Sequence, residues 1–75
     1  MKIEIIGINT INGLKLKKKV IEIANCIDGK ITINLIEEYN IPNLPLLYIN
    51  NKLISQGNVP PKKEIVKYLK NNYKE

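Results

Sequence analysis

The amino-acid sequence predicts an α/β fold, a mixed four-stranded sheet with helices on both faces, in the order strand, helix, strand, helix, strand, strand, helix. Two apolar runs in residues 46–56 are separated by Asn50-Asn51, which is typical of a β-hairpin. Apolar residues recur at helical spacing both before and after these runs. A strand–helix–strand crossover near the N-terminus makes the first two strands parallel neighbours. We expect residues 1–75 to form a single domain.

The first expected strand is Lys2–Ile6, which is mostly apolar, as in a strand buried on both faces. Gly7 ends this strand, and a helix follows from about Asn12. Asp28-Gly29 is expected to end the helix, because glycine readily adopts the left-handed conformation found there. The apolar face of this helix is spaced by four, three and four residues and consists of Leu16, Val20, Ile23 and Ile27.

The middle of the chain has the weakest pattern for predicting helices and strands. Lys30–Ile33 is expected to form a brief strand. Thr32 or Asn34 would then cap a short helix that runs through Tyr39. Two prolines, Pro42 and Pro45, bracket the loop that follows.

The C-terminal part is expected to contain two strands and a helix. The strands are Leu46–Ile49 and Lys52–Ser55, and Gly57 ends the second one. Pro60 and Pro61 suit the first turn of a helix, where a missing N–H costs nothing. The apolar face of this last helix consists of Ile65, Val66, Leu69 and Tyr73.

Composition excludes several kinds of chemistry. The chain has no histidine and one cysteine, Cys26, so it has no intrachain disulfide and lacks the side chain that most readily exchanges protons near neutral pH. Its few carboxylates are scattered along the sequence, and we therefore expect no metal site and no cofactor. The sequence indicates no catalytic residues.

The net charge of +5 is the balance of twelve lysines against seven aspartates and glutamates, and the chain has no arginine. Lysine attracts polyanions weakly but lacks the planar bidentate geometry that base and phosphate recognition favours, which argues against a nucleic-acid partner. No apolar run is long enough to cross a bilayer, and the first residues do not resemble a signal peptide. We expect a soluble cytoplasmic protein that does not associate with membranes.

The ordered set of motifs resembles the small thioredoxin-like and glutaredoxin-like "redox-active disulfide proteins" of archaea and bacteria. The resembling segments are MKIEIIG (1–7), LP (44–45), LLYINNKLISQG (46–57) and NVPPKKEIVKYL (58–69). The resemblance implies a minimal thioredoxin-like fold. Residues 24–40 are shorter than usual for that family and match it poorly.

The resemblance also implies that the two cysteines of the family's Cys-x-x-Cys motif fall on Thr10 and Gly13, so the chain is a degenerate member. Dithiol exchange needs a thiolate at the start of the helix and a second thiol that resolves the mixed disulfide. A threonine hydroxyl is not ionised at neutral pH, and glycine has no side chain. Dithiol oxidoreductase chemistry is therefore not expected, and whether the chain is an enzyme of another kind stays open.

The same resemblance implies a peptide-binding groove at the former active-site edge. Pro45 matches the proline that is cis in the family, and Leu44 would offer its backbone to an extended peptide. Thr10 is interpreted either as a plain helix cap or as a ligand for glutathione. The candidate groove residues are Ile8, Asn9, Thr10, Ile11, Asn12, Leu44, Pro45, Gly57 and Asn58.

Our leading hypothesis is a redox-inert binding or scaffolding module whose partner is an unidentified protein or peptide at this edge. The alternative is a glutathione-linked or thiol-disulfide redox protein that acts through Thr10 or Cys26. Cys26 lies beside the apolar helix face, where a lone cysteine usually packs as a small buried hydrophobe. Two further alternatives are a weak polyanion binder, through its lysine-rich helices, and a self-associating subunit.

Overall fold

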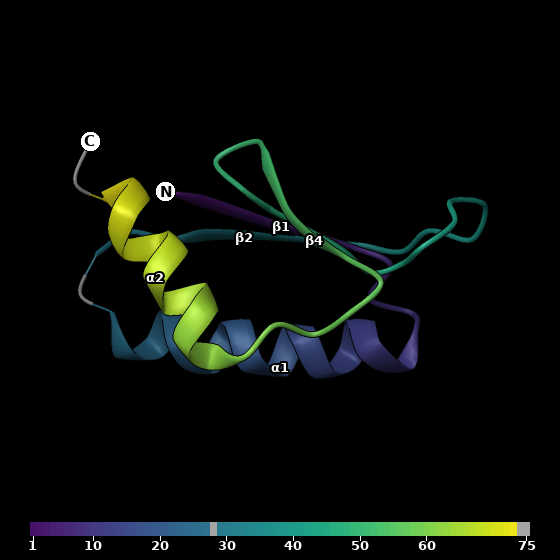
Figure 1. Ribbon diagram of the computed structural model, residues 1–75, viewed down its shortest axis with the longest axis horizontal. Coiled ribbons are helices and arrows are strands. Elements are labelled where there is room, and N and C mark those ends of the chain that lie inside the picture. The colour runs from purple at the N-terminus through teal and green to yellow at the C-terminus, as the bar shows by residue number, and fades with distance from the viewer. Residues whose placement is uncertain (28, 74–75) are drawn as a thin grey trace.

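The computed structural model describes residues 1–27 and 29–73, and describes side chains as far as Lys70. It confirms the α/β fold with a mixed four-stranded sheet (Figure 1). The elements in chain order are β1 (Lys2–Ile6), α1 (Ile11–Cys26), β2 (Thr32–Ile36), β3 (Leu46–Ile49), β4 (Lys52–Gln56) and α2 (Lys62–Tyr73).

The strands lie in the order β2-β1-β3-β4. β1 pairs in parallel with β2, as the crossover predicts, and in antiparallel with β3. β3 and β4 form the predicted hairpin, in which Asn50 and Asn51 have φ of 49° and 68°. Asparagine tolerates this left-handed region better than most residues, and a two-residue hairpin turn requires it.

The core lies on one face of the sheet. Ile3 and Ile5 of β1 are fully buried and pair with Ile49 and Leu47 of β3, so these four side chains share a face. Buried residues of both helices belong to the same cluster, and both helices therefore cover this face, α1 running along it below the sheet in Figure 1. The helical members of the cluster are Leu16, Val20, Ile23, Ile65 and Leu69.

The prediction of a short helix that ends at Tyr39 is wrong. The structure places strand β2 at Thr32–Ile36, and no described residue between β2 and β3 is helical. Asn34 and Ile36 pair with Glu4 and Ile6 of β1, and a helix would forfeit this pairing. The β-branched threonine and isoleucines of β2 also favour a strand.

One face of the sheet therefore has no helix among the described residues, contrary to the prediction of helices on both faces. The expectation that β1 is buried on both faces is wrong for the same reason. Its alternate residues Lys2, Glu4 and Ile6 point to the uncovered face and are only half-buried. An ion pair of 3.5 Å joins Lys2 Nζ to Glu4 Oε1 on that face.

Both helices begin close to where the sequence indicates. α1 ends at Cys26, with Ile27 as its C-terminal cap, whereas Asp28, the expected stop, lies outside the described residues. α2 begins after Pro60-Pro61, and the carbonyl of Pro61 accepts hydrogen bonds from the first turn. Tyr73 is predicted to lie on the apolar face of α2, and its side chain is outside the part of the chain that the structure describes.

Candidate functional site

Thr10 is the N-terminal cap of α1. Its backbone is extended, and its Oγ1 accepts a hydrogen bond of 2.9 Å from the N–H of Gly13. The same hydroxyl donates a hydrogen bond of 2.8 Å to the carbonyl of Gly7. Both hydrogen-bonding functions of the hydroxyl are therefore used inside the chain, and satisfying a free N–H in this way stabilises the helix start.

Gly13 lies where the backbone of the preceding loop comes close to α1. A Cβ built on Gly13 would lie 2.0 Å from the carbonyl oxygen of Gly7 and 2.8 Å from Oγ1 of Thr10. Contacts below 3.0 Å are essentially never seen for real Cβ atoms, and the nearest atom belongs to the backbone. Any side chain at position 13 therefore requires the loop or the helix to move.

Three segments far apart in the sequence meet beside this helix start. The side-chain amide of Asn12 donates to the carbonyl of Gly57 at 3.4 Å, and the N–H of Gly57 donates to the carbonyl of Pro45 at 2.8 Å. Leu44 packs against Gly7, where a Cβ would lie 2.8 Å from the Cβ of Leu44. The Leu44–Pro45 peptide bond is cis.

The candidate residues of this edge differ in exposure. Ile8 is half-buried against the core, and Pro45 is fully buried, so Pro45 does not present its side chain at the surface. Ile11 is 76% exposed although it is apolar, and Asn58 is exposed as well. Leu44 is half-buried, and neither its N–H nor its carbonyl forms a hydrogen bond with the described residues. Ile11 and the Leu44 backbone are thus the groups free to contact a partner.

The loop between β2 and β3 borders the same edge, and the sequence analysis missed it. The Oδ1 of Asn9 accepts a hydrogen bond of 3.1 Å from the N–H of Glu38, which ties the loop to the start of α1. Tyr39, 74% exposed, and Ile41 lie in this loop. The signal was present in the sequence, since both are apolar side chains within a polar, proline-containing stretch.

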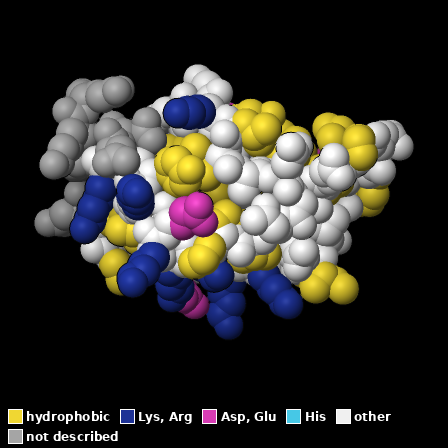
Figure 2. Space-filling view, in the orientation of Figure 1, with side chains coloured by type: hydrophobic (Ala, Val, Ile, Leu, Met, Phe, Trp, Pro, Cys, Tyr) yellow, Lys and Arg dark blue, Asp and Glu magenta, His cyan; other side chains and the backbone are white. Residues whose placement is uncertain are grey.

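The segments that meet at Gly57 carry no charged side chain, whereas the adjoining loop between β2 and β3 begins with Glu37 and Glu38. The loop between β2 and β3 projects at the right of Figure 1, at the end where α1 begins. In Figure 2 this end shows hydrophobic and neutral side chains, whereas lysines gather toward the lower left, over the helices. The segments that meet at Gly57 therefore form an uncharged edge on a protein of net charge +5.

Cys26 is exposed, so the prediction that it packs as a small buried hydrophobe is wrong. Cys26 lies beside the buried face of α1 that contains Ile23. It lines a hollow between α1 and α2, together with Lys62 and Lys70. It is the last of the 16 residues of α1, which places it about 24 Å along the helix from the Thr10 cap at 1.5 Å per residue. The thiol therefore cannot act at the site that Thr10 and Gly13 define.

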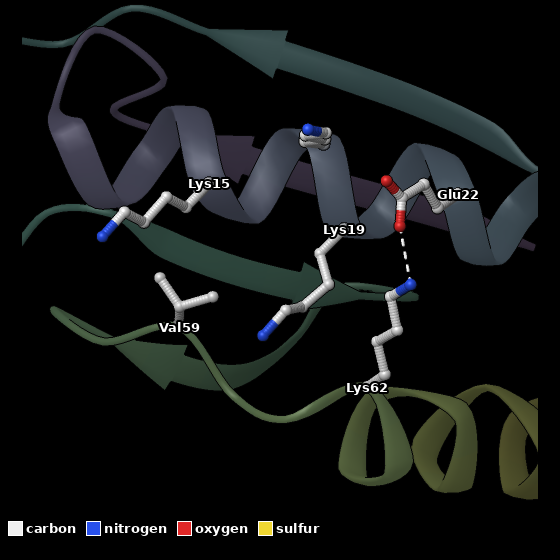
Figure 3. Close-up of a pocket in the computed structure, with 6 residues that line it drawn as sticks. Lys15, Lys19, Glu22, Val59 and Lys62 are labelled. Carbon is white, nitrogen blue, oxygen red and sulfur yellow. Dashed lines mark hydrogen bonds and ion pairs between the residues drawn. The ribbon is translucent and has the colours of Figure 1, made fainter.

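A second hollow lies between α1 and the segment that leads into α2. Lys15, Lys18 and Lys19 line it, with Val59 on the opposite side, and Lys15 and Lys19 extend toward that segment (Figure 3). Lys19 Nζ donates to the carbonyl of Pro60 at 3.2 Å, whereas Lys15 and Lys18 form no ion pair with the described residues.

An ion pair closes one end of this hollow. Lys62 Nζ of α2 lies 2.6 Å from Glu22 Oε2 of α1 (Figure 3). The hydrogen bond from Lys62, together with its positive charge, lowers the pKa of the Glu22 carboxyl below its ordinary value of 4.5. This pair links the two helices across their exposed sides.

Neither metal-binding nor membrane-spanning features are found in the part of the chain that the structure describes. No group of three or more cysteine, aspartate, glutamate or histidine side chains comes together there. Neither α1 nor α2 combines the length and the apolar character that a helix needs to cross a bilayer.

A mixed sheet with a helix start and a cis-proline loop at one edge defines the thioredoxin-like class of α/β proteins. The chain belongs to the thioredoxin domain family, whose sequence profile matches residues 1–70. No curated protein and no solved structure matches the chain.

Proposed function

We propose that this chain is a redox-inert thioredoxin-like module that binds an extended peptide segment of another protein at the edge formed by residues 8–13, Leu44-Pro45 and Gly57-Asn58. The observation that carries the proposal is the closed contact among Gly7, Thr10 and Gly13. A domain that retains its framework but leaves no room for a dithiol is suited to binding rather than to exchange.

The chemical argument starts from the two positions where the family's cysteines fall. The Thr10 hydroxyl is engaged with Gly7 and Gly13 and has no resolving partner. A side chain at Gly13 would require the Gly7 backbone or α1 to move, because its Cβ would lie 2.0 Å from the carbonyl oxygen of Gly7. No single substitution therefore restores the exchange reaction, which needs two thiols within bonding distance.

The binding argument rests on the groups left free at the same edge. The Leu44 N–H and carbonyl can pair with the backbone of an extended peptide, as an unpaired strand edge does. Ile11 and Tyr39 supply exposed apolar surface from the start of α1 and from the loop between β2 and β3. Backbone pairing gives affinity without sequence preference, and the apolar side chains give selectivity for an apolar residue of the partner.

Two measurements test the proposal. Reduction of insulin by dithiothreitol in the presence of the protein is expected to proceed at the background rate, and clear catalysis would contradict redox inertness. Reduced, carboxymethylated insulin B chain serves as an extended probe in a two-dimensional amide NMR titration. The expected shifts fall on Leu44, Ile11 and Gly57, and their absence at millimolar probe would contradict the groove.

A matched pair of variants separates the groove from general hydrophobic binding. Ile11→Ser removes an exposed apolar side chain at the groove and is expected to weaken binding of the probe. Leu53→Ser removes a comparable exposed side chain from β4, toward the Asn50-Asn51 turn, and is expected to leave binding unchanged. Equal losses in both variants would indicate nonspecific contact.

The exposure of Cys26 favours a second candidate, a glutathione-linked function at the hollow between α1 and α2. Lys62 and Lys70 border that hollow and suit the carboxylates of glutathione. Incubation with oxidised glutathione followed by mass spectrometry of the native protein tests it. A stoichiometric mixed disulfide on Cys26 supports this candidate, and an unmodified thiol argues against it.

The lysines around the other hollow favour a third candidate, weak binding of polyanions. Lys15 and Lys18 are free of ion pairs with the described residues, and four of the six residues that line the hollow are lysines. Retention on heparin that disappears at modest salt is the expected signature, because such binding depends on the release of counterions. Retention equal to that of the Lys15→Gln/Lys18→Gln variant would argue against this hollow.

A further inference from the structure

The edge strand β2 is open along its whole length. β1 pairs with one side of it, and no described element pairs with the other side. Thr32–Ile36 contains no charge, no proline and no irregularity of register, which are the devices that usually prevent an edge strand from pairing with another chain.

The free backbone groups of β2 can be assigned residue by residue. The N–H of Thr32 donates to Met1, and the carbonyl of Ile36 accepts from Gly7, so these residues direct their backbone groups toward β1 and the segments that flank it. Successive residues of a strand alternate in this respect. Ile33 and Leu35 therefore direct their N–H and carbonyl groups toward the open edge.

We propose that two copies of this chain associate through antiparallel pairing of their β2 strands about a twofold axis at Asn34, which forms a continuous eight-stranded sheet. In this register Ile33 of one copy lies opposite Leu35 of the other. The residues with outward backbone groups thus face each other and exchange four hydrogen bonds, whereas Asn34 meets its own counterpart in a pair without backbone hydrogen bonds.

Charge complementarity identifies a second copy as the occupant. Lys30 precedes β2, and Glu37-Glu38 follows it. The antiparallel register places Lys30 of one copy opposite Glu38 of the other, at both ends of the shared pair of strands. Parallel pairing would instead place like charges together, which is unfavourable at this spacing.

Apolar surface flanks the same edge. Leu35 and Ile36 of β2 are exposed. They pair with Ile5 and Ile6 of β1, so they lie on opposite faces of the sheet. Pairing of the strands would bury both of these apolar side chains in each copy.

A disulfide tests the register directly. In a Cys26→Ser background, Asn34→Cys places two thiols at the twofold axis, where opposed Cα atoms of such a pair lie about 4.5 Å apart. The matched control, Thr32→Cys, lies on the same strand and the same face. It is displaced from its counterpart by four residues, about 14 Å along the strand. Mild oxidation is expected to cross-link the first variant rapidly and the second one slowly or not at all. Equal rates for the two variants would overturn the register.

Sedimentation under reducing conditions tests the association itself. The wild-type chain is expected to sediment as a dimer as its concentration rises from micromolar to millimolar. Asn34→Lys, an exposed position in the monomer, is expected to stay monomeric because two ammonium groups would meet at the axis. Gln56→Lys adds the same charge to the other edge strand and is expected to dimerise as the wild type does.

Three outcomes would overturn the proposal. The first is a wild-type chain that remains monomeric at millimolar concentration. The second is equal dimerisation of the Asn34→Lys and Gln56→Lys variants, with the fold of each checked by circular dichroism. The third concerns amide hydrogen exchange at Ile33 and Leu35. If these amides exchange freely at high protein concentration and become protected only when a foreign peptide is added, the edge binds another partner and not a second copy.

Discussion

Thr10 and Gly13 are joined by a hydrogen bond of 2.9 Å from the Gly13 N–H to the Thr10 hydroxyl, and both residues contact the carbonyl of Gly7. The two positions that we propose correspond to the dithiol of related proteins thus serve as one structural unit. That unit closes the turn between β1 and α1 and fixes the start of the helix. The first two predictions concern its stability.

Thr10→Ala removes the cap of α1 and leaves the Gly13 N–H without its partner. Loss of such a cap costs about 1 kcal/mol of unfolding free energy. Urea denaturation followed by circular dichroism is expected to show this loss. Thr10→Ser keeps the hydroxyl and is expected to retain most of the stability, and an equal loss in both variants would assign the effect to the threonine methyl group instead.

Gly13→Ala is expected to destabilise the protein although alanine is the better helix former. The gain in helix propensity is about 1 kcal/mol. Forcing extra atoms into a packed site usually costs about 1–3 kcal/mol, and the contact here is with backbone atoms. The clash is therefore expected to outweigh the gain. Leu14→Ala, at the next and exposed position, serves as the control, and a Gly13→Ala variant more stable than the wild type would contradict the tight contact.

Glu22→Gln is expected to reduce the loss of stability at acidic pH. The pKa of Glu22 is lower in the folded chain than in the unfolded one, because Lys62 donates to the carboxylate and attracts it. Its contribution is present above the unfolded pKa and is lost as the pH falls through the lowered folded pKa. The effect is expected to be small, since both side chains are largely exposed.

The measurement for this pair is thermal unfolding of wild type and variant from neutral to strongly acidic pH. The wild type is expected to lose more stability over this range than Glu22→Gln. Lys62→Gln removes the partner of the carboxylate and should likewise flatten the pH dependence. Parallel curves for wild type and both variants would show that the ion pair contributes nothing measurable.

Cys26 is expected to react in the native protein. Because the side chain is exposed in the hollow between the helices, iodoacetamide should modify it without prior unfolding. Intact mass spectrometry, with and without urea, checks the stoichiometry and its dependence on the fold. Cys26→Ser is expected to leave the midpoint of thermal unfolding nearly unchanged. A thiol that reacts only in urea would indicate burial.

Local signals in the sequence are sufficient to predict several elements of the fold. The asparagine pair set the hairpin turn, the proline pair set the start of α2, and the spacing of Leu16, Val20 and Ile23 set the buried face of α1. These features depend on φ preferences and on helical periodicity, which are properties of a few neighbouring residues. The absence of a dithiol also follows from the sequence, since it requires only that the cysteines be counted.

The strand formed by residues 32–36 and the exposure of Cys26 depend on tertiary contacts that local sequence patterns do not predict. The short apolar run of β2 fits a strand or a helix, and pairing with β1, thirty residues away, made it a strand. Among the residues that the structure describes, that outcome left one sheet face without a helix and β2 without an outer neighbour. The closed contact at Gly13 depends in the same way on the path of the Gly7 backbone, because distances between segments are set by packing and not by spacing along the chain.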